Sequence, residues 1–78
     1  MPLHKNDALA LIRDHIAAVS GGKLRSSDLH EHTPMSSLWM FNAAKQVAEA
    51  KGWRLRERAP EWDPSMTFGK FLRRYSRS

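Results

Sequence analysis

Glycine and proline interrupt this sequence at three places, and the interruptions limit which regular elements it can form. Gly21-Gly22, Pro34 and Gly52 divide the first 58 residues into stretches that each fit one short element. Glycine readily adopts the left-handed conformation that ends a helix, and proline is tolerated in a helix only in its first turn. The chain has 78 residues and no cysteine, so one small apolar core must hold these elements without disulfides.

The first stretch has the apolar periodicity of a helix. Apolar residues recur at spacings of three, four and three, which places them on one helical face. Asn6 or Asp7 can cap the start, because either side chain accepts a hydrogen bond from a free backbone N–H group. We therefore predict a helix from this cap to Ser20-Gly21-Gly22. The residues of its apolar face are Leu9, Ile12, Ile16 and Val19.

The second stretch predicts a short helix. Ser26 or Ser27 can open it, and it runs to about Thr33 with Leu29 as its main apolar anchor.

A longer third helix is expected to begin between Pro34 and Ser37 and to end at about Lys51, before Gly52. The positions that trace one apolar face of this helix are Leu38, Phe41, Ala44 or Lys45, and Val47 or Ala48.

Residues 53–58 alternate between two kinds of side chain. In an extended chain successive side chains point to opposite faces, so this stretch is expected to form a short strand with one basic face. Burial of Trp53 and Leu55 would leave three guanidinium groups in solvent. The basic face consists of Arg54, Arg56 and Arg58, and the opposite face of Trp53, Leu55 and Glu57.

Pro60 and Pro64 make regular structure unfavourable for residues 59–65. Trp62 lies between the two prolines and has two interpretations. It folds back as a lid on a small core, or it anchors a protein partner.

The last segment, Met66 to Tyr75, is expected to be a helix capped by Ser65, with Phe68, Phe71 or Leu72, and Tyr75 on its apolar side. Gly69 weakens this helix by about 1 kcal/mol relative to alanine. A strand over residues 66–68 is the competing assignment.

The predicted order is helix, short helix, tight turn, longer helix and strand. In this order and in element lengths, residues 8–58 resemble a winged helix-turn-helix domain, with Lys23-Leu24-Arg25 where that family often places its first short strand. The resemblance implies a mainly α fold, with a three-helix helix-turn-helix core, a short strand or wing, and a C-terminal basic helix. We expect one domain over residues 1–78, flexible at 1–5 and 76–78. A plain three-helix bundle is the alternative.

The resemblance also implies a function, namely binding of double-stranded DNA by a transcriptional or replication accessory factor. The longer helix would be the recognition helix, whose exposed side chains meet base edges and phosphates in the major groove. The arginine strand would hold the DNA backbone. The candidate residues on the helix are Ser36, Ser37, Asn42, Lys45 and Gln46.

The charge distribution agrees with a nucleic-acid partner. Residues 1–40 hold four Lys or Arg and four Asp or Glu, whereas residues 41–78 hold nine against four and carry the whole formal charge of +5. A basic chain of this kind, with a pI near 10.3, fits nucleic acid. A second basic cluster follows the strand, and its residues are Lys70, Arg73, Arg74 and Arg77.

Other classes of function lack the residues they need. Without cysteine there is no thiolate metal site, and His30 and His32 are two positions apart, so on a helix they cannot share one ion. Only an extended loop would bring them together with Asp28. Nucleophile elbows and phosphate loops are also missing. We expect no metal, no cofactor and no catalysis.

No apolar run approaches the roughly 20 residues of a membrane span, and the start of the chain lacks the apolar region of a signal peptide. The expected location is the cytoplasm or the nucleoid.

A protein partner is the main alternative to DNA. One helical face cannot bury the whole apolar run from Leu38 to Phe41, so Trp39 or Met40 is expected to be exposed. Together with Trp62, these residues would dock a small adaptor or inhibitor onto a larger protein or nucleoprotein complex. A homodimer is also compatible, because paired modules raise DNA affinity. In RNA binding, Trp53 or Phe68 would stack on unpaired bases.

Overall fold

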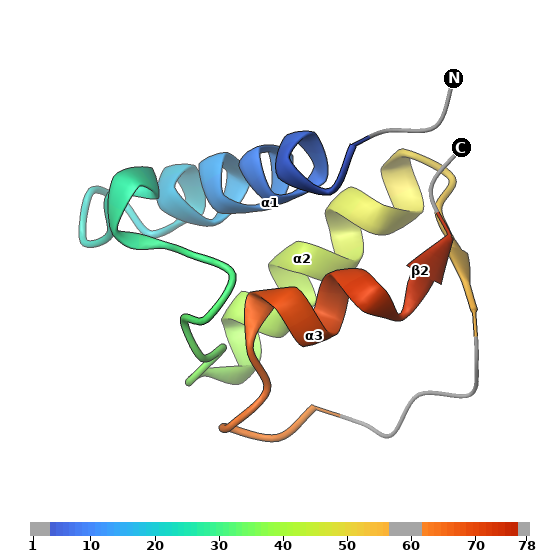
Figure 1. Ribbon diagram of the computed structural model, residues 1–78. Coiled ribbons are helices and arrows are strands. Elements are labelled where there is room, and N and C mark those ends of the chain that lie inside the picture. Colours follow the sequence, from blue (N-terminus) through green and yellow to red (C-terminus); the bar gives the residue numbers. More distant parts are fainter. Residues whose placement is uncertain (1–3, 57–61, 77–78) are drawn as a thin grey trace.

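A computed structural model of the protein describes residues 4–56 and 62–76 (Figure 1). The first helix, α1, spans Lys5–Val19. It therefore begins earlier than predicted. Neither Asn6 nor Asp7 is the cap, because His4 occupies that position and makes no side-chain capping bond. Asp7 instead lies in the first turn, where a carboxylate interacts favourably with the helix dipole.

The apolar face of α1 is covered along only part of its length. Ile12 and Ile16 are completely buried, as the periodicity predicts, and Ala8 is buried with them. Val19, on the same face at the end of the helix, is 51% exposed. The helix ends where expected, at Gly21 and Gly22, whose φ angles of 67° and 89° lie in the left-handed region.

The predicted second helix is wrong, whereas the predicted helix-turn-helix core stays a prediction. The structure has only a 3-10 turn, η1, at Ser26–Asp28. Leu29 is already extended, although it is buried as expected. The Thr33 hydroxyl accepts a hydrogen bond from the His30 N–H group at 2.8 Å, which stabilises a local turn instead of a helix. Pro34 then forms an isolated antiparallel bridge with Thr67.

The longer helix, α2, spans Leu38–Ala50 and is followed by Gly52 at a φ of 71°. Its buried face is rotated relative to the prediction. Leu38 is 52% exposed, and Met40 is only 5% exposed. Met40 is therefore a core residue and not part of a docking surface. The buried residues of α2 are Met40, Ala43, Ala44 and Ala48.

The predicted strand is much shorter than its sequence pattern. Strand β1 covers Arg54–Leu55 and pairs antiparallel with β2, Tyr75–Ser76. Trp53 is 7% exposed, as expected, but Leu55 is 51% exposed, so the prediction that both are buried is half wrong. Strand β1 has only two residues and pairs with a strand of the same length, and this small sheet leaves the Leu55 side chain largely in solvent. The predicted positions Glu57 and Arg58 lie outside the described residues.

The last helix, α3, spans Phe68–Arg73 and is shorter than predicted. Its cap is Thr67 and not Ser65, because the Thr67 hydroxyl accepts a hydrogen bond from the Lys70 N–H group at 3.2 Å. Close packing explains why a glycine, Gly69, occupies a position inside this helix. Its N–H donates to the Glu31 carbonyl at 2.8 Å, and a Cβ there would lie 3.0 Å from the same oxygen.

The protein is mainly helical, with one small antiparallel sheet. Helix α1 packs on both α2 and α3, and the core lies among the three helices (Figure 1). The ring of Phe71 meets Phe41 edge to face at 5.9 Å and contacts the Tyr75 ring at 5.0 Å. Trp62 packs against this core, and its indole N–H donates to the Met35 carbonyl at 2.7 Å, which confirms the lid interpretation. In the parts of the chain described, every helix is too short or too polar to cross a membrane.

Candidate nucleic-acid interface

The structure joins the two basic clusters of the sequence into one surface, which we call the basic patch. The cations of β1 lie beside those of α3, because β2 follows α3 directly and pairs with β1. In this pairing Arg54 lies opposite Ser76, and the Arg56 N–H group donates to the Arg74 carbonyl at 2.6 Å. Backbone contacts thus link residues that are 18 positions apart. The described residues of the basic patch are Arg54, Arg56, Lys70, Arg73 and Arg74.

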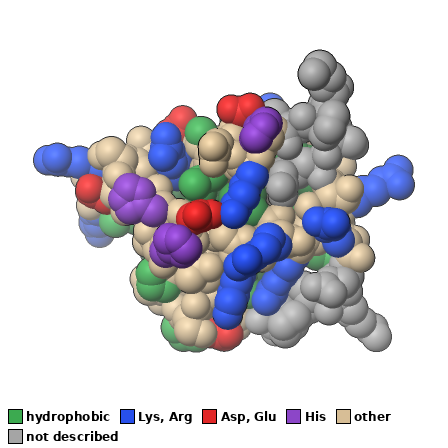
Figure 2. Space-filling model, in the orientation of Figure 1, with side chains coloured by type: hydrophobic (Ala, Val, Ile, Leu, Met, Phe, Trp, Pro, Cys, Tyr) green, Lys and Arg blue, Asp and Glu red, His purple; other side chains and the backbone are tan. Residues whose placement is uncertain are grey.

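The patch is exposed. Arg54, Arg56, Lys70 and Arg73 are exposed, and Arg74 is half-buried. Figure 2 shows Lys and Arg side chains gathered over α3 and toward the sheet on the face that it presents. Lys70 and Arg73 also lie in the last turn of α3, where positive charge interacts favourably with the helix dipole. Arg77, which belongs to the second basic cluster of the sequence, lies outside the described residues.

Two carboxylates, Glu31 and Asp63, border the patch. Glu31 forms ion pairs with Lys5 at 2.6 Å and with His32 at 3.5 Å. The hydrogen bond and charge of Lys5 are the main cause of the lowered pKa of Glu31, and Arg73 adds a smaller effect.

Asp63 is a second carboxylate at the margin. Hydrogen bonds from the Ser65 hydroxyl and the Ser65 N–H group lower the pKa of Asp63, and the charges of Lys70 and Arg74 lower it further. At neutral pH both Asp63 and Glu31 are ionised, so the cations of the patch outnumber the carboxylates whose pKa values they influence.

The patch rests on a packed apolar layer. Phe68, Phe71 and Leu72, on the inner side of α3, are at most 1% exposed. Beside them, burial raises the pKa of the Tyr75 hydroxyl. This layer anchors α3 and β2, and so holds the backbone that carries Lys70, Arg73 and Arg74 against the core.

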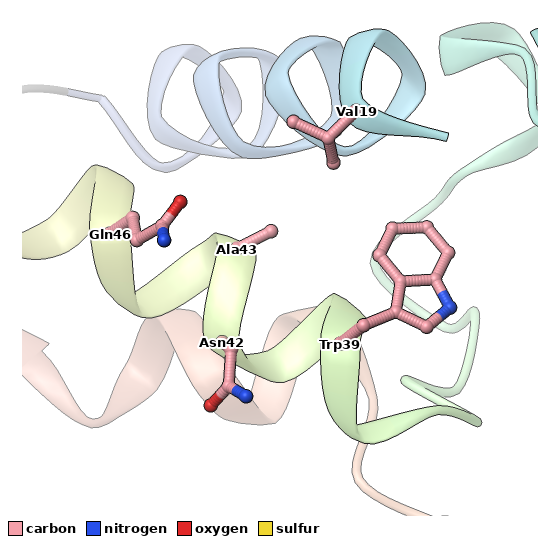
Figure 3. Close-up of a pocket in the computed structure, with 5 residues that line it drawn as sticks. All are labelled: Val19, Trp39, Asn42, Ala43 and Gln46. Carbon is pink, nitrogen blue, oxygen red and sulfur yellow. The ribbon is translucent and has the colours of Figure 1, made fainter. Parts of the chain in front are cut away.

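The candidate base-reading residues of α2 lie elsewhere. A groove of about 420 Å³ lies between α1 and α2, and Gln46 and Asn42 line it (Figure 3). The Gln46 amide oxygen lies 3.3 Å from His15 Nε2 on α1. Asn42 is drawn pointing away from α1. The lining residues are Val19, Trp39, Asn42, Ala43 and Gln46.

The remaining α2 candidates also have local contacts. The Ser36 hydroxyl lies 4.0 Å from Met40 Sδ, and Ser37 precedes α2 without a side-chain capping bond. The Lys45 ammonium lies over the Phe41 ring, 5.7 Å from its centroid. In the described part of the chain, no hydrogen bond or ion pair that we find joins these residues to the basic patch. Their proposed contact with DNA bases stays a prediction.

Two further expectations can be judged from burial. Phe68 is completely buried and Trp53 nearly so, which means that the prediction of base stacking on these rings is wrong. Trp39, at 42% exposed, is the exposed tryptophan on α2. Within residues 4–56 and 62–76, no group of three or more His, Asp or Glu side chains is placed to hold a metal ion.

Sequence reasoning did not predict that the two basic clusters form one surface. It also missed Thr67 as the residue that fixes the start of α3. The sequence did carry a signal for this cap. Thr67 lies three positions before Lys70, and a capping hydroxyl usually accepts a hydrogen bond from the backbone N–H group two or three positions later.

Comparison of the chain with protein-family models, with curated proteins and with solved structures gives no match. The winged helix-turn-helix resemblance therefore stays a prediction that rests on element order and length.

Proposed function

We propose that the protein is a small, non-enzymatic DNA-binding protein that holds the backbone of double-stranded DNA with the basic patch. The observation that supports this proposal most strongly is that strand pairing brings the backbone of Arg54 and Arg56 beside the segment that follows α3, close to the second group of cations. A role as a transcriptional or replication accessory factor, in the cytoplasm or on the nucleoid, follows from the same proposal.

Physical chemistry supports phosphate as the ligand of the patch. Guanidinium groups donate hydrogen bonds in a planar fork that matches phosphate oxygens, and four of the cations belong to arginine. Contacts to phosphates supply affinity and orientation but little sequence information. The proposal therefore predicts DNA binding that depends strongly on salt and weakly on sequence.

The test is a fluorescence-anisotropy titration of the protein into a labelled random-sequence duplex at several salt concentrations. For the wild type, log K falls linearly with log salt concentration. The variant Arg54→Ala/Arg56→Ala lowers the slope by roughly 0.9 for each phosphate contact that it loses. The matched control Lys23→Ala/Arg25→Ala removes two exposed cations outside the patch and leaves the slope unchanged.

Two results would count against the proposal. Absence of binding at low salt by the folded protein would exclude DNA as a ligand of this surface. An equal loss of slope in both variants would show that DNA binding depends only on the net charge of the protein, and the assignment of binding to the patch would fail.

A second candidate function has its own observation. Trp39 lines the groove and is 42% exposed, and exposed tryptophans are frequent anchors of protein interfaces. An adaptor or inhibitor that binds a larger protein or nucleoprotein complex would use this surface. In that case Trp39→Ala abolishes capture of the complex, and Arg54→Ala/Arg56→Ala does not. Trp62 is a weaker anchor, since its indole N–H group already binds Met35.

A further inference from the structure

The small sheet places a serine hydroxyl beside one of the arginines of the basic patch. Strand β2 follows α3 directly and runs antiparallel to β1 (Figure 1). In the register of this sheet, Ser76 lies directly opposite Arg54. Side chains at opposite positions of an antiparallel pair lie on the same face of the sheet, with Cβ atoms about 5 Å apart. The Arg54 guanidinium and the Ser76 hydroxyl therefore share one face, although they are far apart in the sequence.

The shared face is the solvent side of the sheet. Trp53, which precedes Arg54 in the chain, is 7% exposed, so the alternation of an extended chain directs Arg54 away from the core. Arg54 and Ser76 are both exposed. Within residues 4–56 and 62–76, neither side chain takes part in a hydrogen bond or an ion pair. Their donor groups are thus available to a ligand on this side.

The two donor groups together have the chemistry of a phosphate site. A guanidinium supplies positive charge and several N–H groups in a planar fork. A serine hydroxyl adds an uncharged O–H group, and its hydrogen bond to an anionic oxygen is short and strong. A phosphate group presents more than one anionic oxygen, so one phosphate can accept from the Arg54 guanidinium and the Ser76 hydroxyl at the same time.

The surroundings favour a phosphate that belongs to a chain of phosphates. The Arg56 N–H group donates to the Arg74 carbonyl, which continues the pairing of the two strands beyond Leu55. The Arg56 side chain therefore lies on the same face as Arg54, about 7 Å farther along the strand. A ligand with repeated phosphates can bind at both positions, whereas the single carboxylate of an acidic side chain occupies one of them.

We infer that Arg54 and Ser76 form a phosphate-binding subsite of the basic patch, in which the guanidinium and the hydroxyl hold the same phosphate group. The assignment of this phosphate to DNA rests on the proposed function. The subsite itself recognises the phosphate group, which a nucleic-acid backbone or a free phosphate supplies. In this subsite Arg54 contributes charge, and Ser76 contributes a hydrogen bond that does not depend on charge.

Salt dependence separates the two contributions. In fluorescence-anisotropy titrations with a random-sequence duplex, Ser76→Ala raises the Kd about fivefold, because one hydrogen bond to a charged group is lost. It leaves the salt slope unchanged, since no charge is removed. Arg54→Ala raises the Kd and lowers the slope by roughly 0.9. Because both residues hold one phosphate, adding Ser76→Ala to Arg54→Ala changes the Kd by less than about twofold.

Two matched variants serve as controls. Ser76→Thr keeps the hydroxyl and suits a strand, so its Kd stays within about twofold of the wild type. Ser27→Ala removes the hydroxyl of an exposed serine on η1, outside the patch, and leaves the Kd unchanged. Circular dichroism checks that each variant is folded.

Inorganic phosphate tests the subsite without DNA. The ¹⁵N-labelled wild-type protein is titrated to about 50 mM phosphate at constant ionic strength, a range that detects a millimolar Kd. The amide resonances of Arg54 and Ser76 shift together with one Kd. Those of Lys23 and Arg25, which are exposed cations outside the patch, do not shift.

The outcomes distinguish this inference from the proposed function. If Ser76→Ala binds DNA like the wild type, or if the two substitutions act additively, the inference is overturned, while a lower slope in Arg54→Ala still supports DNA binding. Phosphate binding at Arg54 and Ser76 without any DNA binding upholds the subsite and removes the proposed function. Coupled effects on DNA without a response to inorganic phosphate uphold the subsite for a phosphodiester. Absence of both responses overturns both proposals.

Discussion

The basic patch and the outer face of α2, by which we mean the exposed side of the helix with Leu38, Asn42, Lys45 and Glu49, are both exposed surfaces of one small molecule, but they are built differently. The patch combines two segments whose backbones meet between Arg56 and Arg74, and it carries several cations. The outer face belongs to a single helix, and its charges balance. The comparison shows that helical periodicity alone can define a surface, whereas the charge density of the patch depends on strand pairing.

The largest expected effect comes from Phe71→Ala, which removes the support of both surfaces. Phe71 is 1% exposed and contacts the rings of Phe41 on α2 and Tyr75 on β2. The loss of transfer free energy and the cavity together lower the free energy of unfolding by about 3–5 kcal/mol. Urea unfolding followed by circular dichroism measures the change. The exposed neighbour Arg73→Ala should leave stability within about 0.5 kcal/mol of the wild type, and an equal loss in both variants would contradict the account.

A smaller loss is expected for Trp62→Phe, which keeps an aromatic ring but removes the N–H group that donates to Met35. The free energy of unfolding should fall by about 1 kcal/mol, the usual net value of one hydrogen bond. Thermal unfolding checks this value. A variant as stable as the wild type would show that the lid acts through ring packing alone.

Thr67→Ala is expected to affect the patch and not the outer face of α2, because Thr67 caps α3. Loss of the capping bond to the Lys70 N–H group should lower stability by about 1 kcal/mol. Amide hydrogen exchange should become faster in α3 than in the middle of α2. Thr67→Ser, which keeps the hydroxyl, is the control and should exchange like the wild type.

The smallest effect concerns pH. Pairing with Lys5 lowers the pKa of Glu31 below its ordinary value of 4.5, so ionised Glu31 stabilises the fold above that pH and this contribution is lost as the pH falls. The pair is exposed, so the effect on stability is small. Between about pH 6 and 3, the midpoint of thermal unfolding should fall slightly more for the wild type than for Glu31→Gln. Parallel curves would show that the pair does not contribute.

The helices could be predicted where the information is local. Helix α1 was predicted from the spacing of Ile12 and Ile16 and from the glycines at 21 and 22. The end of α2 was predicted from Gly52. The bounds of α1 and α3 differed by a few residues because His4 and Thr67 take the cap positions.

The failures involve contacts between distant segments. Residues 29–35 do not form a helix, because the backbone there bonds to the first turn of α3 and to the segment before it, through Glu31 with Gly69 and Met35 with Met66. Leu55 could not be placed without knowing that its strand has two residues and pairs with Tyr75. For the same reason the sequence showed two basic clusters but not the single patch that they form.

The central claim is that the patch, assembled from two distant segments, is the DNA-binding surface. The most direct test is a titration of ¹⁵N-labelled protein with a random-sequence duplex, followed through the backbone amide resonances. The account predicts that the amides of residues 54–56 and 70–76 shift together and saturate at the same DNA concentration, while those of residues 38–49 change little. Shifts confined to residues 36–46, with the patch unmoved, would contradict it.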